Sequence, residues 1–307
     1  MIEGIAGLKG ALGYVRAYRG RTFVVKAGGE VLGDHRTRDA LAAQVGLLHS
    51  LGIRCVLVHG GGPQATALGR RLGVEPVLVA GRRVTDDAQL EIAKMTFAGT
   101  VKVDLLAALR HSHVPAVGLT GVDADLLTAA RRPPREVAGD DGVTRLVDFG
   151  HVGDIESVDV SVLLALLGAG FVPVVSSLAG DADGNVYNVN ADTVAEKLAV
   201  ALKAAKLLVL TGAPGVLRDA SDPTTGVSFA DAADLESLVR SGAISGGMRP
   251  KVEACVRAAE GGVERTHVLD GRTPDALLLE VFTGAGCGTM IVPRKEKEAY
   301  ADAELAG

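Results

Sequence analysis

The sequence predicts an α/β fold, an open and mainly parallel sheet sandwiched between helices and arranged in two lobes. Short valine-rich runs alternate with longer alanine- and leucine-rich stretches, which is the rhythm of βαβ units in a sheet covered on both faces. Hydrophobic residues make up 48% of the 307 residues, enough to fill such a core. Two of the predicted strands run directly into glycines, which points to an anion site at their carboxyl ends.

Each expected strand is a short, mostly apolar run. These runs are residues 22–26, 54–59, 116–119, 172–176, 207–210 and 266–269. Most of the expected helices have aspartate or serine near their start and glycine near their end, as helix termini prefer. They are residues 36–51, 63–71, 86–110, 160–167, 192–202, 230–241 and 248–261.

Residues 125–147 interrupt this alternation. They contain the pair Pro133-Pro134, a cluster of three arginines, and the turn sequence Asp140-Asp141-Gly142. Proline and Asp-Gly favour turns. We therefore expect an inserted hairpin at the edge of the sheet.

The first twenty residues also stand apart, because Ile5, Leu8, Leu12 and Val15 repeat at helical spacing before the first strand. This pattern predicts an amphipathic amino-terminal helix, which needs an apolar partner. The partner is either the core of the same chain or a second subunit.

Composition excludes several classes of function. The chain carries 32 basic and 37 acidic residues, a net charge of −5, with 3% aromatic residues and no tryptophan, so we expect small-molecule substrates and neither a nucleic acid nor a membrane partner. Its three cysteines form no Cys-x-x-Cys pair, which argues against a disulfide framework or a zinc site. No apolar run reaches the roughly 18 residues of a bilayer span, and the start lacks a signal-peptide pattern. A cytoplasmic location is expected.

Lys26 ends the first strand and is followed by Gly28 and Gly29. A lysine at the end of a valine-rich strand costs desolvation unless an anion meets it, and glycine amides approach a phosphate with no Cβ in the way. The alternative is a lysine that simply reaches solvent. The segment has neither the G-x-x-x-x-G-K-[ST] nor the G-x-G-x-x-G spacing, so P-loop and Rossmann sites are not indicated.

A second glycine loop, Gly60-Gly61-Gly62-Pro63, follows the second strand and opens a helix. Proline suits a first helical turn. Three glycines exceed what a structural turn requires, since each costs about 0.5–1 kcal/mol in regular structure. We expect its free amides to face an anion and His59 to position the loop.

Polar side chains follow two further segments. Arg82 and Arg83 precede a helix, and an arginine fork suits a substrate carboxylate, although adjacent arginines also occur on solvated surfaces. Asn188 and Asn190 share one side of an extended segment that ends at Asp192. Their amides offer donors and acceptors to a polar ligand, whereas Asp192 could also be only a helix cap.

A third glycine turn, Gly246-Gly247, enters a helix that carries Lys251. If Lys26 and Lys251 converge on one phosphoryl group, their charges neutralise the charge that develops during transfer. A carboxylate such as Asp192 between them would keep both lysines charged and oriented.

Taken jointly, these segments resemble the amino acid kinase family over nearly the whole chain. The segments that carry the resemblance are Val25-Lys26-Ala27-Gly28-Gly29, Val58-His59-Gly60-Gly61-Gly62-Pro63, Gly81-Arg82-Arg83-Val84-Thr85, Gly150-His151-Val152-Gly153, Asn188-Val189-Asn190-Ala191-Asp192 and Gly246-Gly247-Met248-Arg249-Pro250-Lys251.

The resemblance implies ATP-dependent phosphorylation of the γ-carboxylate of N-acetyl-L-glutamate, the second step of arginine biosynthesis. It implies that Lys26 and Lys251 steady the phosphoryl group and that Asp192 organises them. No base is needed, because a γ-carboxylate with a pKa of about 4.3 is already ionised. The implied substrate-binding residues are Gly60, Gly61, Arg83 and Asn188. The implied phosphate and nucleotide-binding residues are Gly28, Gly29, Thr211, Gly212, Gly215 and Gly247.

The resemblance also implies a division of labour along the chain. Residues 1–21 form an oligomerisation helix, residues 22–202 bind the amino-acid substrate, and residues 203–307 bind ATP. Mg²⁺ is expected on the phosphates of ATP rather than on a protein ligand cluster. The inserted hairpin is expected to close over the substrate and exclude water.

Members of the family that arginine inhibits carry a similar amino-terminal helix, which interlaces dimers into a ring-like hexamer. The resemblance therefore implies inhibition by arginine and a homodimer or a hexamer built as a trimer of dimers. The implied arginine-binding residues are Tyr14, Arg16, His267, Glu280 and Gly286.

Three positions depart from the family pattern on the substrate side, namely Glu30, Arg82 and Val122. They leave N-succinylglutamate and a carrier-linked aminoadipate open as alternative acceptors, although the Gly-Gly-Gly-Pro loop and Asn188 favour N-acetylglutamate. A different kinase of the same fold, such as aspartokinase, glutamate 5-kinase or carbamate kinase, is a further alternative. So is a catalytically silent arginine sensor, but retention of Lys26 and Lys251 argues against it.

Overall fold

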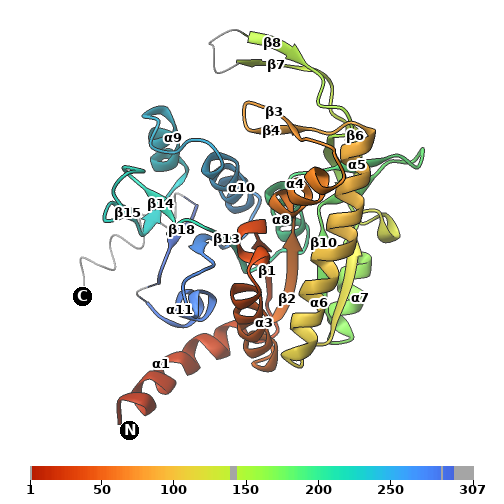
Figure 1. Cartoon of the computed structure of the whole chain (residues 1–307). Helices are drawn as coiled ribbons and strands as arrows, with labels where there is room; N and C mark the ends of the chain where they lie inside the picture. The colour runs from red at the N-terminus through yellow and green to blue at the C-terminus, as the bar shows by residue number, and fades with distance from the viewer. Residues whose placement is uncertain (1, 139–143, 285, 294–307) are drawn as a thin grey trace.

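A computed structural model describes residues 2–138, 144–284 and 286–293. Its centre is an eight-stranded sheet in the order β16-β18-β17-β13-β1-β2-β10-β5 (Figure 1). The strands are β1 (Thr22–Ala27), β2 (Arg54–His59), β5 (Ala116–Thr120), β10 (Val172–Ser176), β13 (Lys206–Thr211), β16 (Phe229–Ala230), β17 (Arg265–Asp270) and β18 (Thr289–Ile291). Neighbouring strands are parallel except β17 and β18. The predicted mainly parallel sheet is confirmed.

Helices cover both faces of this sheet, and the alternation of side chains along β1 explains why. Phe23 and Val25 join one core cluster, while Val24 joins the other, because successive strand residues point to opposite faces. The first face is covered mainly by α3 (His35–Ser50), α6 (Lys102–His111) and α11 (Ala276–Phe282). The second is covered by α7 (Ser161–Gly168), α8 (Ala191–Ala201) and α10 (Met248–Glu260).

Shorter elements complete the described fold. Its shorter helices include α2 (Gly29–Gly33), α4 (Gly62–Arg71), α5 (Asp87–Ala93), α9 (Ala232–Arg240) and a 3-10 turn at Asp123–Asp125. Two of its small hairpins pair β3 (Val77–Val79) with β4 (Arg82–Val84) and β14 (Val216–Leu217) with β15 (Gly226–Val227). The predicted division into lobes at residue 203 stays a prediction. The main sheet runs without a break across the two predicted lobes, because β1 pairs with both β2 and β13.

The predicted uniform helix over residues 86–110 was wrong in its middle. A π-helical segment, Lys94–Val101, separates α5 from α6. Phe97 of this segment lies against Gly61, where an added Cβ would be 2.9 Å from the Phe97 ring. The wider π turns thus lie beside the second glycine loop. Such π-helical segments are frequently found at functional sites.

The predicted hairpin is present, but its predicted place at the edge of the main sheet was wrong. Strands β7 (Arg135–Ala138) and β8 (Thr144–Val147) pair with each other only, and they project from the body of the molecule (Figure 1). The predicted turn at residues 140–142 lies outside the described residues.

The segment that carries this hairpin belongs instead to a second sheet with the order β12-β11-β6-β9. Its strands are β6 (Leu127–Arg131), β9 (Gly153–Val158), β11 (Leu178–Gly180) and β12 (Val186–Asn188). Arg132 and Arg135 both pair with Asp154 of β9, which fixes the base of the hairpin to this sheet.

The amino-terminal helix is confirmed as α1 (Ile2–Tyr18). Its carboxyl end packs on the chain's own core, where Tyr18 is buried and meets Phe23 edge to face. Farther out the helix extends away from the body (Figure 1), and Leu12 is exposed. The carboxyl end of the helix therefore packs against its own chain, whereas the apolar Leu12 is left exposed by the described part of the chain.

No helix within the described part of the chain is both long and apolar enough to cross a bilayer.

Candidate active site

The two glycine loops at the carboxyl ends of β1 and β2 lie against each other. Gln64, near the start of α4, donates a hydrogen bond from Nε2 to the carbonyl oxygen of Gly29 over 2.7 Å. A Cβ added to Gly29 would lie 2.7 Å from both Gln64 Oε1 and Pro63 Cδ. Glycine is therefore required for this close approach, and Gln64 is a site residue that the sequence analysis missed.

The second loop also reaches the start of α8. A Cβ on Gly60 would be 3.4 Å from the Cβ of Ala191, the residue before Asp192. Asn190 caps α8 by accepting a hydrogen bond from the amide of Asp192. The alternative interpretation of Asp192 as only a helix cap is therefore wrong, and its carboxylate is free for other partners.

That carboxylate joins the two lysines. Lys26 Nζ lies 2.7 Å from Asp192 Oδ1, and Lys251 Nζ lies 3.9 Å from Asp192 Oδ2. Lys26 and Asp192 are 6% exposed and Lys251 is 19% exposed at their side chains. Two ammonium groups thus share one carboxylate in a largely desolvated place, which leaves a net positive charge there.

Burial lowers the pKa of Lys251, and the like charge of Lys26 lowers it further, while Asp192 and Glu30 act in the opposite direction. The Lys251 ammonium also donates a hydrogen bond to the carbonyl oxygen of Gly247 over 2.8 Å. An arriving anion would relieve the repulsion between the lysines, so the arrangement suits phosphate binding.

Arg83 is held beside the second glycine loop. Its guanidinium donates to the Gly62 carbonyl oxygen over 3.2 Å, to Thr66 Oγ1 over 2.6 Å and to Gln89 Oε1 over 2.9 Å. Burial lowers the pKa of this half-buried side chain. These contacts hold the fork in one orientation near the loop.

Asn188 is connected to the same region, since its Nδ2 donates to Thr85 Oγ1 over 3.2 Å. Thr85 ends the strand segment that carries Arg83 and forms a β-bridge with Gly150. The structure therefore brings together, through a small set of contacts, the predicted substrate residues Gly60, Gly61, Arg83 and Asn188.

Among the residues predicted to bind the nucleotide, Thr211 ends β13 and is buried. Gly212 follows it beside the first glycine loop, and its amide donates a hydrogen bond to Glu30. Gly28 is close to Lys26, because a Cβ there would lie 3.9 Å from Nζ. Gly215 lies farther along, packed against Thr289 of β18 with φ 118°. The contacts of Gly215 are with the sheet, not with the lysines.

His59 is fully buried at the end of β2. Its Nδ1 lies 2.9 Å from the Gly60 carbonyl oxygen, so Nδ1 carries the proton and donates. Burial and, to a smaller extent, the charge of the nearby Lys102 lower its pKa to about 4, against the opposing effect of the hydrogen bond to Gly60. A neutral His59 positions the loop by hydrogen bonding, as its place before three glycines predicts.

A second buried cluster lies on the other face of the sheet. His267 Nδ1 is 2.6 Å from Glu280 Oε1, and His267 Nε2 is 3.0 Å from Lys206 Nζ. The amide of Cys287 donates to Glu280 Oε2 over 2.7 Å. A Cβ on Gly286 would lie 2.9 Å from the same oxygen. Three of the predicted arginine-binding residues are therefore in contact.

The amino-terminal helix reaches this cluster through its aromatic side chains. The ammonium of Lys206 lies 5.2 Å from the centre of the Tyr18 ring, a cation–π distance, and Tyr14 stacks on Tyr18 at 6.4 Å. Arg16 is exposed on α1, and none of these contacts includes it. Lys206 and Tyr18 were not predicted as site residues, although a lysine in the apolar strand β13 is the same kind of signal as Lys26 in β1.

Charge is balanced inside this cluster. Burial lowers the pKa of Lys206 to about 8 and that of His267 to about 4. Burial raises the pKa of Glu280, but hydrogen bonds from His267 and the Cys287 amide, with the charge of Lys206, bring it below its usual value. The result is a neutral imidazole between an ammonium and a carboxylate.

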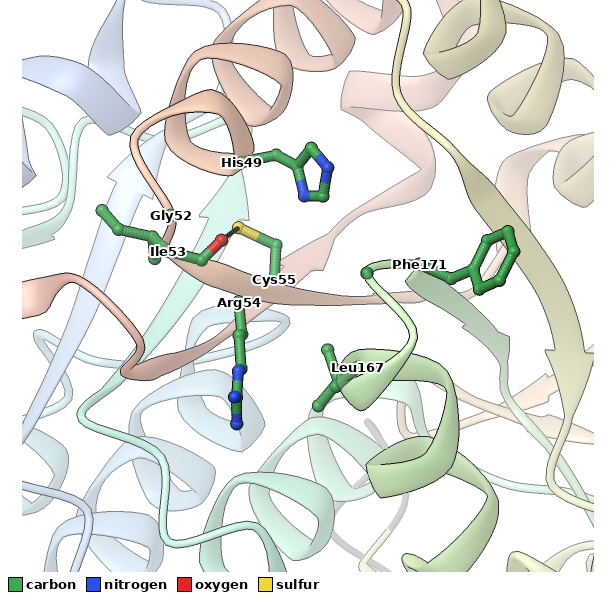
Figure 2. Close-up of a pocket in the computed structure, with 8 residues that line it drawn as sticks. His49, Gly52, Ile53, Arg54, Cys55, Leu167 and Phe171 are labelled. Atoms are coloured by element: carbon green, nitrogen blue, oxygen red, sulfur yellow. Dashed lines mark hydrogen bonds between the residues drawn. The ribbon is translucent and has the colours of Figure 1, made fainter.

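A surface hollow at the opposite end of the sheet is unrelated to this chemistry (Figure 2). It is lined by His49, Gly52, Ile53, Arg54, Cys55, Leu167, Gly170 and Phe171, at the amino ends of β2 and β10, whereas open parallel sheets bind ligands at their carboxyl ends. Burial raises the pKa of the Cys55 thiol to about 12, which leaves it unreactive.

Among the described residues, no group of three or more His, Cys, Asp or Glu side chains is arranged to hold a metal ion.

Comparison with known proteins agrees with this geometry. Residues 21–270 match the model of the amino acid kinase family. An acetylglutamate kinase from Myxococcus xanthus is 50% identical over 289 residues, 94% of each chain. One from Methanothrix thermoacetophila is 43% identical over 281 residues, 92% of this chain and 96% of that one. The chain belongs to the amino acid kinase family.

Solved structures extend the comparison. An N-acetylglutamate synthase from Neisseria gonorrhoeae, complexed with coenzyme A and N-acetyl-glutamate, matches with a TM-score of 0.80 and 34% identity. The match covers 94% of this chain and 63% of the synthase chain. The same synthase complexed with coenzyme A and L-arginine matches at 33% identity and TM-score 0.80, covering 94% and 65%. A carbamate kinase from Giardia lamblia, at 17% identity and TM-score 0.64 over 89% of this chain and 99% of that chain, shares the fold.

The low pKa of His59 predicts acid sensitivity. Its folded-state pKa of about 4 lies below the unfolded value of 6.5, so the unfolded chain takes up the proton first as the pH falls. The corresponding stability is fully present above pH 6.5 and is lost between pH 6.5 and 4, to a total of about 3 kcal/mol. A His59→Asn variant keeps a side-chain donor but cannot titrate.

Urea unfolding across this pH range checks the prediction. We expect the parent to lose about 3 kcal/mol more than His59→Asn, the contribution of His267 being common to both. Parallel stability curves for the two proteins would contradict the assignment.

Proposed function

We propose that this protein transfers the terminal phosphoryl group of ATP to the γ-carboxylate of N-acetyl-L-glutamate, the second step of arginine biosynthesis. The observation that carries the proposal is the meeting of Lys26 and Lys251 on Asp192 between glycine loops. Acetylglutamate kinases 40–50% identical over more than nine-tenths of this chain support the choice of substrate. The free thiols Cys55, Cys255 and Cys287 fit the expected cytoplasmic location.

In the proposed mechanism, positioning and charge do most of the work. Lys26 and Lys251 face the transferring group and neutralise the negative charge that develops on its oxygens. Asp192 holds both ammonium groups at one place before substrate arrives. The residues require no general base, because the attacking carboxylate is ionised at neutral pH.

The remaining residues divide between a proposed ATP side and a proposed acceptor side of the site. Gly28, Gly29, Gly212 and Gly247 would lie against the phosphates of ATP, where the absence of a Cβ allows a close approach, with Thr211 and Gly215 shaping the strand end behind them. Mg²⁺ bound to those phosphates would neutralise part of their charge, and the buried lysines and glycine amides fit such a ligand.

On the acceptor side, Gly60 and Gly61 would present amides to the reacting carboxylate. Arg83 and Asn188 would hold the α-carboxylate end, because the guanidinium fork already lies beside the loop and suits a carboxylate. The lobe assignment, with acceptor binding in residues 22–202 and ATP binding in residues 203–307, belongs to the same proposal.

A panel of acceptors tests this function directly. With ATP, Mg²⁺ and hydroxylamine to trap acyl phosphate, we expect product from N-acetyl-L-glutamate and much less from N-succinylglutamate, aspartate, glutamate or carbamate. Lys26→Ala and Lys251→Ala are each expected to lower kcat about 10²–10³-fold, as the loss of a transition-state charge does. The larger part of each effect should fall on kcat, with KM changing less.

The partly exposed Lys94, paired with the exposed Glu91, provides the matched control. Lys94→Ala removes the same charge and side chain away from Asp192 and should retain activity. Turnover of another acceptor in preference to N-acetyl-L-glutamate would contradict the substrate, and full activity in Lys251→Ala would contradict the mechanism.

We further propose that arginine inhibits the enzyme by binding at the cluster of His267, Glu280 and Gly286, next to Tyr14. A guanidinium suits the carboxylate of Glu280, and the neighbouring synthase structure is complexed with L-arginine. The outer part of α1, with Arg16 and exposed Leu12, would then contact a second dimer and build a hexamer.

Arginine titration with sedimentation tests this regulation. We expect arginine to inhibit the parent, and Glu280→Gln to raise the half-inhibitory concentration at least about tenfold, the usual loss for a charged hydrogen-bond partner. Sedimentation should give a species larger than a dimer. Undiminished activity at saturating arginine, from a protein that sediments as a dimer, would contradict both parts.

A further inference from the structure

Glu30, which the sequence led us to expect on the substrate side, contacts Gly212 and so places a carboxylate at the proposed nucleotide side of the site. It follows Gly29 at the start of α2, and its Oε2 accepts a hydrogen bond from the Gly212 amide over 3.0 Å. A Cβ on Gly212 would overlap this carboxylate. Because Gly212 has no side chain, there is space for the carboxylate of Glu30. Glu30 therefore supplies an acidic group beside the carboxyl end of β13.

The peptide of Gly212 is fixed from its other side as well. Arg272 donates a hydrogen bond from Nη2 to the Gly212 carbonyl oxygen and is itself held by Asp270 at 2.9 Å. Hydrogen bonding to Asp270 raises the pKa of Arg272, and Glu30 contributes in the same direction. The carboxylate of Glu30 is thus anchored, although the residue is exposed.

The charge of Glu30 reaches Lys251. Glu30 is one of the charges that act on Lys251, where it favours the protonated ammonium. Lys26, Asp192 and Lys251 carry a net positive charge, and Glu30 adds a negative charge at their edge toward β13. A fixed carboxylate at this edge repels an approaching phosphate chain.

We propose that Glu30 is a specificity residue that makes the site select the magnesium complex of ATP over free ATP. This inference rests on the proposed function. Free ATP carries about two more negative charges than its Mg²⁺ complex, so a nearby carboxylate penalises free ATP more strongly. Hydrated Mg²⁺ keeps several of its waters, and a carboxylate accepts hydrogen bonds from such waters.

The expected size of the effect follows from screened electrostatics. Free ATP and its Mg²⁺ complex differ by about two charges. One fixed charge at a partly exposed position, at moderate ionic strength, changes the ratio of their dissociation constants about tenfold. Glu30→Gln removes the charge but retains an oxygen that can accept from the Gly212 amide. Glu30→Ala removes both the charge and the hydrogen bond.

Calorimetric titration of the full chain with ATP, in excess MgCl₂ or in EDTA without acceptor, measures this selectivity without turnover. We expect Glu30→Gln to lower the ratio of the free-ATP to the Mg-ATP dissociation constant about tenfold, mainly through tighter binding of free ATP. The difference from the parent should shrink as KCl is raised. Glu30→Ala should change the ratio in the same direction.

Glu264→Gln is the matched control. Glu264 pairs with Arg21 at the amino ends of β17 and β1, the edge of the sheet opposite Gly212, so the same change in charge should leave the ratio unchanged. A parental ratio in Glu30→Gln would overturn the proposal. So would a change confined to Glu30→Ala, because it would assign the effect to the hydrogen bond. A parent that binds ATP in neither condition would instead overturn the proposed function, and this inference with it.

Discussion

The site is organised around one buried carboxylate shared by two ammonium groups. Asp192 meets Lys26 from the centre of the sheet and Lys251 from α10. Removing the carboxylate would leave two like charges poorly solvated, a situation that costs about 3–5 kcal/mol when a buried pair is broken. With it in place, the cluster keeps one positive charge in excess, which is the condition for attracting and stabilising a phosphoryl group. The same interaction therefore serves folding and the proposed catalysis.

The parallel sheet explains how residues so distant in sequence meet. Lys26 has the same parity along β1 as Val24, so it points to the face covered by α8 and α10. Those helices begin at the carboxyl edge of the sheet and bring Asp192 and Lys251 there. Lys206 lies at the opposite edge, beside His267 and beneath α1. Two buried lysines thus define two polar clusters, one suited to phosphate and one beside the proposed oligomerisation helix.

Much of this arrangement could be predicted from the sequence. Strands 54–59 and 172–176 were predicted with their observed bounds, and the convergence of Lys26, Asp192 and Lys251 was expected from glycine turns placed at helix and strand ends. The π-helical segment was missed because Phe97 and its neighbours keep a helical pattern in either geometry. The second sheet was missed because its strands are short and because β6 pairs with β9 and β11, which lie far from it in the sequence. Gln64 and the bond of Glu30 to Gly212 depend on tertiary approach of two loops, which no local pattern reports.

The most direct test is a crystal structure of the protein with ADP, Mg²⁺, aluminium fluoride and N-acetyl-L-glutamate, in which the fluoride group mimics the transferring phosphoryl group. The account predicts that Nζ of Lys26 and Nζ of Lys251 both lie about 3 Å from its ligand atoms, with Asp192 still between them. An aluminium fluoride group held by other cations, with either lysine more than about 6 Å away and beyond direct contact, would contradict it.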